Sequence, residues 1–134
     1  GFDLCLGDAV LTKEDMEALM NSGKEEAVFS VKCNRLLAEY NLAAHNQYFV
    51  DLPDAVAMAV ALWDDIAIEK KPCYAYVCRK EEAAYGQVIF NDGSKLAIQE
   101  GFGEHAPNVE VCTKLNNALY KRRLLSLLME DYEK

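Results

Sequence analysis

Long apolar runs and basic residues are both scarce in this chain of 134 residues. The longest apolar run, Ala55 to Trp63, covers about two helical turns, whereas a helix that crosses a bilayer needs roughly 20 residues. The 14 Lys and Arg residues are outnumbered by 22 Asp and Glu residues, which gives a net charge of -8. A surface of this sign repels phosphate backbones. These shortages argue against a membrane protein and against a nucleic-acid partner.

Recognisable cysteine motifs and targeting signals are missing as well. The five cysteines are an odd number, and their spacing matches neither a zinc site nor a CxxC redox motif. The segment Gly1 to Cys5 has no basic region and no cleavage signature of a signal peptide. We therefore expect reduced cysteines that pack as small apolar residues in a cytoplasmic protein.

What the sequence does contain is an ordinary globular balance, with 51% apolar and 27% charged residues. Its length suits a single domain over residues 1–134, in which roughly two-thirds of the unfolded surface is buried. The apolar spacing predicts helices over 12–20, 24–42, 53–63 and 116–132. Strand-like segments are 73–78, 86–91, 94–98 and 108–112, with a hairpin at Asp92-Gly93. The helix 53–63 is apolar nearly all round, so we expect it to be buried on most sides. In the helix 116–132 we expect the basic run Lys121 to Arg123 to face water.

Asp54 differs in character from the rest of its helix, which is otherwise built from Ala, Val, Met and Leu. A carboxylate in the first turn is stabilised by the unpaired N–H groups and the helix dipole, so a plain capping role is one reading. The other reading is a metal ligand or a catalytic carboxylate at the rim of an α/β sheet. Composition alone leaves both open.

The stretch Leu52 to Leu62 resembles the C-terminal signature of the inosine-uridine-preferring nucleoside hydrolases, in which a His-Asp-Pro element leads into an Ala-rich helix. Other segments follow in the family's order. Gly1 to Cys5 looks like a strand end before a Leu-Thr helix cap, Tyr85 to Asp92 looks like a family strand, and Pro107 to Val111 looks like the last one. The segment Pro53 to Leu62 carries the most specific part of the resemblance.

This resemblance implies an α/β fold: the C-terminal portion of an open, mostly parallel sheet fold, with helices and a small antiparallel β-hairpin region. It also implies hydrolysis of the N-glycosidic bond of a purine or pyrimidine ribonucleoside. In the family, calcium holds the ribose hydroxyls and the attacking water, and a ligand aspartate occupies the position of Asp54. The implied metal ligand of this chain is therefore Asp54.

Several family features have no counterpart in this chain. The N-terminal Asp-x-Asp-x-x-x-Asp-Asp motif is absent, and Asp64-Asp65 fits a solvated helix end. Calcium takes six to eight oxygen ligands, so we expect no stable calcium on this chain alone and no hydrolysis by it. Pro53 stands where many members have a His that protonates the leaving base. His45 and His105 are candidates for that role, and the alternative is that each is a surface residue of a loop.

Three interpretations stay open. The chain is a C-terminal fragment of a longer hydrolase, a non-catalytic binding or regulatory module with the same fold, or an unrelated α+β domain. A start without Met, inside an apolar stretch, favours the fragment. A partial α/β fold leaves an uncovered apolar face and strand edges. We therefore expect self-association, as a dimer.

Overall fold

The computed structural model describes residues 2–80, 82–93 and 105–130. The chain divides into two compact units, which we treat separately. Unit 1 comprises Gly1–Ala67 and Leu115–Lys134, and unit 2 comprises Ile68–Lys114. Within the described ranges, no helix is both long and apolar enough to cross a membrane.

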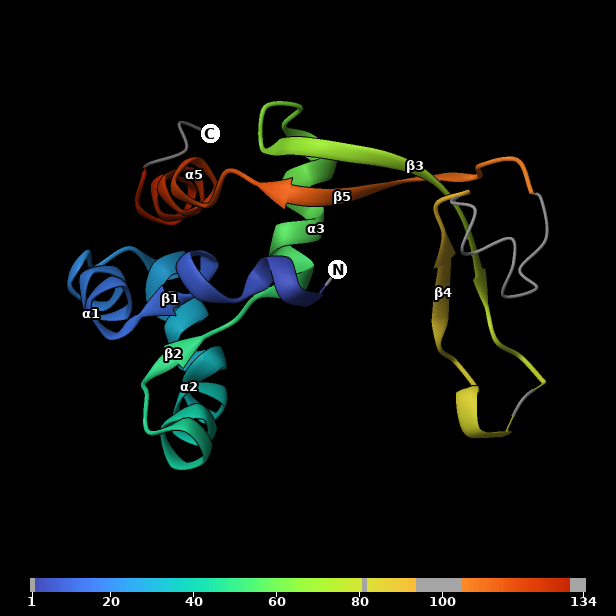
Figure 1. The fold of residues 1–134 in the computed structure, drawn as a ribbon. Helices are drawn as coiled ribbons and strands as arrows, with labels where there is room; N and C mark the ends of the chain where they lie inside the picture. The colour runs from blue at the N-terminus through green and yellow to red at the C-terminus, as the bar shows by residue number, and fades with distance from the viewer. Residues whose placement is uncertain (1, 81, 94–104, 131–134) are drawn as a thin grey trace. The chain divides into compact units, whose positions relative to one another are not determined.

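Unit 1 is mainly helical, with one short pair of strands (Figure 1). Its elements are η1 (Phe2–Cys5), η2 (Gly7–Ala9), β1 (Leu11–Thr12), α1 (Lys13–Asn21), α2 (Glu25–His45), β2 (Phe49–Val50), α3 (Pro53–Leu62) and α5 (Asn117–Met129). Strands β1 and β2 are antiparallel, with Leu11 opposite Val50 and Thr12 opposite Phe49.

Local signals explain where these helices begin and end. Thr12 caps α1 through a capping box, because its side chain accepts from the Asp15 N–H while the Asp15 carboxylate accepts from the Thr12 N–H. Asn46 ends α2 in the left-handed conformation, at φ 56°, and this residue turns the chain back toward β2. Pro53 begins α3, where its missing N–H leaves no bond unmade.

Two apolar clusters hold unit 1 together. The first joins η1, α3 and α5 through Cys5, Ala9, Val56, Ala59, Ile66, Leu115 and Tyr120. The second joins β1, α1, α2 and β2 through Leu11, Met16, Leu19, Ala27, Ala38 and Val50. Residues of α5 pack against both clusters, so this helix connects them.

Unit 2 is built on an antiparallel sheet. Its elements are β3 (Ala67–Val77), η3 (Glu82–Ala84), β4 (Val88–Asn91) and β5 (Val109–Leu115), in the sheet order β4-β3-β5. Strands β3 and β4 run antiparallel from the Tyr74–Asn91 pair to the Val77–Val88 pair. On the other edge of β3, the Asn108 side chain binds both the N–H and the carbonyl of Ala75, at 2.7 and 2.9 Å.

The α/β class, with helices and small antiparallel sheets, is confirmed, and so are the four expected helices. Helix α2 extends three residues beyond the predicted end, to His45. Strand β3 starts at Ala67 and runs through Pro72, which the sequence reading had placed before the strand. No disulfide joins any of the five cysteines, all of which lie within the described residues. The strand predicted over 94–98 lies outside the described residues.

Three expectations need correction. Residues 2–5 form a 3-10 turn instead of a strand end. Helix α3 buries only Val56 and Ala59, while Met58 and Leu62 on its other side are 58% and 64% exposed. Lys121, expected in water, is half-buried in an ion pair with Asp15.

Candidate functional site

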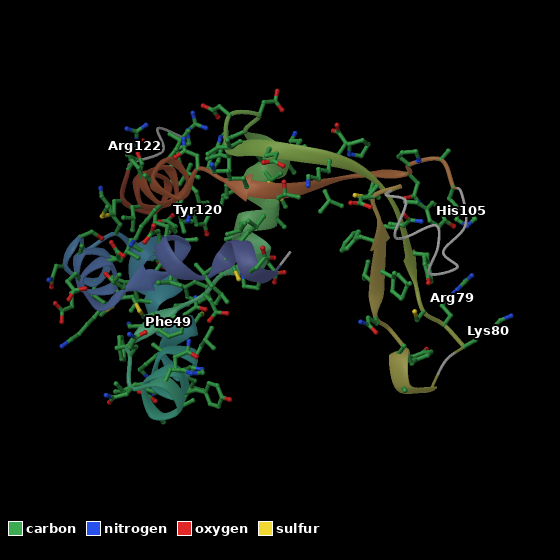
Figure 2. The ribbon with its side chains drawn as sticks, viewed as in Figure 1. Phe49, Arg79, Lys80, His105, Tyr120 and Arg122 are labelled. Atoms are coloured by element: carbon green, nitrogen blue, oxygen red, sulfur yellow. The ribbon has the colours of Figure 1, made fainter. Side chains whose placement is uncertain are left out.

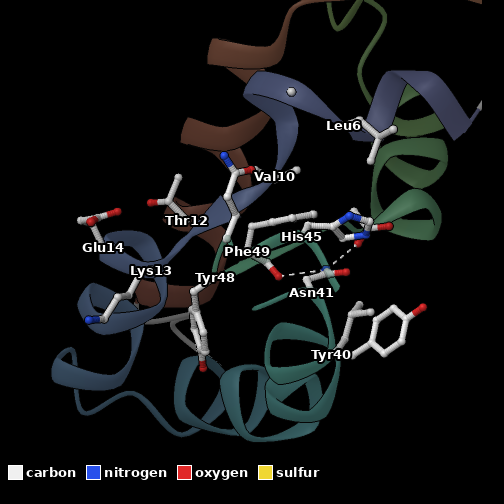
Figure 3. A pocket seen from close by; sticks show the side chains of 14 residues that line it. Leu6, Val10, Thr12, Lys13, Glu14, Tyr40, Asn41, His45, Tyr48 and Phe49 are labelled. Atoms are coloured by element: carbon white, nitrogen blue, oxygen red, sulfur yellow. Dashed lines mark hydrogen bonds between the residues drawn. The ribbon is translucent and has the colours of Figure 1, made fainter. Parts of the chain in front are cut away.

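A pocket of about 1030 Å³ lies in unit 1, between the start of the chain and the C-terminal half of α2 (Figure 3). Apolar and aromatic side chains make up much of its lining, among them Leu6, Val10, Tyr40, Tyr48 and Phe49. A concave, largely apolar site of this size with a few polar groups is the usual form of a small-molecule site. Its polar lining residues include Thr12, Glu14, Asn41, His45 and Asp51.

Asn41 organises the polar part of the pocket. This residue of α2 is only 4% exposed, and its Nδ2 donates to the Phe49 carbonyl at 3.1 Å and to Asp51 Oδ1 at 3.3 Å (Figure 3). A buried amide must be hydrogen-bonded, because an unpaired polar group costs free energy in the core. The two bonds join α2 to β2 and orient the Asp51 carboxylate at the pocket.

His45, the candidate proton donor, also lines this pocket. It is the last residue of α2 and is exposed, and its ring centroid lies 6.2 Å from that of Phe49. An imidazole at this place can act as a general acid or base toward a molecule in the pocket. Its catalytic role stays a prediction.

The wall of the pocket at Thr12 is fixed by an ion pair between two helices. Lys121 Nζ of α5 lies 2.6 Å from Asp15 Oδ2, which also accepts from the N–H and the hydroxyl of Thr12. Burial by itself would raise the pKa of Asp15, but the bonds from Lys121 and Thr12 outweigh it and hold the pKa below its usual value. Asp15 therefore stays charged and anchors Thr12.

Asp54, the predicted calcium ligand, lies in the first turn of α3 and is exposed. It is not part of the pocket lining, whereas Asp51, in the segment before α3, is. Over residues 2–80, 82–93 and 105–130, no three His, Cys, Asp or Glu side chains come together to hold a metal ion. Asp54 has the chemistry of a calcium ligand, but a calcium site needs six to eight oxygens. The described residues alone do not make up such a site.

His105, the second histidine candidate, belongs to unit 2 (Figure 2). Its ring stacks on Tyr74, with the two centroids 4.3 Å apart. The structure therefore gives His105 an aromatic neighbour on the sheet, while His45 faces the pocket of unit 1. The two histidines are chemically alike but differently placed, which makes them a matched pair for experiments.

Sequence reasoning missed Asn41 and Asp51. Asn41 lies inside a long helix, where an isolated Asn reads as a surface residue, and only the fold shows that it is buried. A signal for Asp51 was available, since it stands in the same Asp51-Leu52-Pro53-Asp54 segment as the predicted ligand.

Comparison with known proteins shows the fold of the chain. No protein-family model matches the sequence, and no curated protein matches it. Among solved structures, the plant nucleoside hydrolase PpNRh1 superposes with a TM-score of 0.78 at 18% identity, over 92% of this chain and 38% of that protein. An inosine-guanosine nucleoside hydrolase superposes with a TM-score of 0.68 at 17% identity, over 93% and 36% respectively. The chain therefore has the fold of part of a nucleoside hydrolase, and spans less than two-fifths of either protein.

Proposed function

We propose that this chain forms one part of a calcium-dependent ribonucleoside hydrolase, in which its pocket binds the nucleoside and Asp54 supplies one metal ligand. The observation that carries the proposal is the superposition of 92% of the chain on a plant nucleoside hydrolase. The aromatic lining of the pocket, with a histidine and a carboxylate beside it, supports it further.

The reaction defines what each part must do. Water adds to the C1′ atom of the ribose, the N-glycosidic bond breaks, and the base leaves with the bonding electron pair and takes up a proton. In this chain, Tyr48 and Phe49 offer aromatic surface to a flat base. Pro53 has no proton to give, so His45 is the candidate donor to the leaving base.

Asp54 provides the link to the metal. It lies in the first turn of α3, a place where helices commonly carry an acidic side chain. The remaining ligands would come from outside this chain, since the described residues hold no further carboxylate cluster. The chain alone is therefore expected to be inactive on inosine and uridine. Turnover of either nucleoside by the chain alone would contradict the proposal that the other metal ligands come from outside it.

Nucleoside binding can be tested on the chain itself by two-dimensional NMR. We expect inosine or uridine to shift the amide signals of Tyr48, Phe49 and Asp51, and ribose alone to shift them less. His45→Ala should weaken the binding several-fold, and His105→Ala, the matched control on unit 2, should leave it unchanged. Equal effects of the two substitutions, or no pocket shifts at millimolar nucleoside, would refute the assignment of the pocket.

Calcium binding tests the role of Asp54. One carboxylate with water should bind calcium at about millimolar strength or more weakly. We expect the Asp54 amide to shift only at such concentrations, and the shift to disappear in Asp54→Asn but not in Asp64→Asn, a control at the other end of the helix. Binding that is much tighter, or that survives Asp54→Asn, would show that the ligands lie elsewhere.

A second candidate is a non-catalytic binding module with the same fold. The absence of a carboxylate cluster among the described residues favours it. The genomic sequence upstream of Gly1 separates the two candidates. An in-frame Asp-x-Asp-x-x-x-Asp-Asp motif there supports the hydrolase, and a start codon at this point supports the module.

A further inference from the structure

Helix α2 carries apolar side chains on two opposite faces. One face is buried in the core through Ala27 and Ala38. On the other, Phe29, Leu36 and Tyr40 are 67%, 71% and 65% exposed, and Cys33 between them is exposed as well. Each residue of an α-helix turns about 100° around the helix axis, so these four side chains lie within about 60° of one another around that axis. They lie nearly opposite the buried face. We call them the α2 stripe.

The spacing of the α2 stripe, with steps of four, three and four residues, is that of a coiled-coil seam. We propose that the α2 stripe is the interface of a homodimer in which two copies pack their α2 helices antiparallel about a twofold axis. In this arrangement Phe29 faces Tyr40 of the second copy, and Cys33 faces Leu36 of the second copy. Aromatic residues thus meet at both ends, and smaller ones at the axis.

The charges beside the stripe select this arrangement. One edge of the stripe carries Glu25, Lys32 and Glu39, all exposed. In the antiparallel pair Lys32 lies beside Glu39 of the second copy, and the twofold axis makes the same contact twice. The other edge carries Ser30, Leu37 and Ala44, which bring no opposing charges. A parallel pair would set Lys32 against Leu37 and lose both ion pairs.

The exposed apolar face of α3 offers no such match. Helix α3 exposes Met58 and Leu62, but this helix has 10 residues and its one charged residue is Asp54, so a self-pair would leave carboxylates without partners. The α2 stripe is therefore the face on which a second copy finds complementary charge. This inference does not rest on nucleoside binding, although Tyr40 belongs both to the stripe and to the lining of the pocket.

The size of the stripe sets the strength of the dimer. The exposed surfaces of the two aromatic side chains, with those of Leu36 and Cys33, provide roughly 400 Å² per copy. A total of about 800 Å² is below the usual size of stable interfaces. We therefore expect a weak dimer that forms with rising protein concentration. Sedimentation velocity of the chain under reducing conditions, from micromolar to millimolar concentration, measures this directly.

Charge reversal tests the contact itself. Lys32→Glu and Glu39→Lys each place like charges across the interface, so each should weaken self-association about ten-fold or more. An equal mixture of the two variants should dimerise again, because each copy then offers the charge that the other lacks. Lys70→Glu, on the exposed part of β3, is the control and should behave as wild type. Circular dichroism checks that α2 keeps its helix in every variant.

The outcomes are decisive. Recovery in the mixture supports the antiparallel pair of α2 helices, since no contact within one chain can produce it. A wild-type chain that stays monomeric up to millimolar concentration overturns the proposal. Single variants that dimerise normally, or a mixture without recovery, overturn it too.

Discussion

The ion pair between Asp15 and Lys121 should be a main support of unit 1, and it can be measured. The pair joins the first turn of α1 to α5 at 2.6 Å, with side chains that are only 18% and 22% exposed. Asp15→Asn removes the charge but keeps an oxygen that can accept from the Thr12 N–H. The substitution therefore isolates the contact with Lys121 from the helix cap.

The expected magnitude follows from burial. Fully exposed pairs contribute up to about 1 kcal/mol, and breaking a buried pair costs about 3–5 kcal/mol. For this half-buried pair we expect Asp15→Asn to lower the free energy of unfolding by about 2 kcal/mol. In a chain of this length that corresponds to a melting temperature lower by about 8 °C. Lys121→Met, which keeps the aliphatic stem, should cost a similar amount.

The effect should also depend on pH. Because the folded protein lowers the pKa of Asp15, its stabilisation is complete well above the unfolded value of about 3.9. It is lost as the pH falls from there through the lower folded-state pKa. The difference in stability between wild type and Asp15→Asn should therefore be full at neutral pH and shrink in this acid range.

A double-mutant cycle gives the decisive number. Urea unfolding of wild type, Asp15→Asn, Lys121→Met and the double variant should return a coupling energy of about 1.5–2 kcal/mol. A coupling below about 0.5 kcal/mol would show that the pair behaves as a surface contact and would refute this reasoning. So would a difference between wild type and Asp15→Asn that stays constant down to pH 3.

Two further predictions concern buried polar groups. Tyr120 is almost fully buried, its hydroxyl has no hydrogen-bond partner among the described residues, and burial raises its pKa to about 12. Tyr120→Phe should therefore leave the free energy of unfolding unchanged or raise it by up to about 1 kcal/mol. If urea unfolding shows a decrease of more than about 1 kcal/mol, the Tyr120 hydroxyl has a hydrogen-bond partner. Asn41→Ala removes the two bonds to Phe49 and Asp51 and should cost about 2 kcal/mol. It should also weaken inosine binding in the NMR titration, whereas Asn34→Ala, on the same helix, should not.

The parts of the fold that the sequence predicted are those determined by neighbouring residues. The Thr12-x-x-Asp15 spacing indicates a helix start, and the capping box is present. Pro53 indicates another start, and α3 begins there. At Asp92-Gly93, Gly93 has φ 73° and its N–H donates to Asn91 Oδ1, while the second half of the predicted hairpin lies outside the described residues. In each case a side chain next in sequence decides the backbone conformation.

The parts that the sequence missed depend on distant residues. The basic run Lys121 to Arg123 indicates a solvent-facing surface. Only the packing of α5 on α1 brings Lys121 to Asp15. Asn41 is buried because β2 returns to α2 after the turn at Asn46. Pro72 fits inside β3, although proline usually marks a strand end. Short-range patterns hold no information about these contacts.

The exposed side of α3 connects these observations with the proposed function. A helix that is apolar nearly all round is normally buried, yet Met58 and Leu62 remain in solvent here. Asp54 lies four residues before Met58, so helical spacing puts all three on one side of α3. An incomplete metal site would have this form: one carboxylate at the edge of an uncovered apolar surface, which a second segment bearing the other ligands would cover. Such a segment should bury Met58 and also strengthen calcium binding at Asp54. Met58→Lys should weaken the binding of the segment and the calcium binding that depends on it. The same substitution should not change calcium binding to the chain alone.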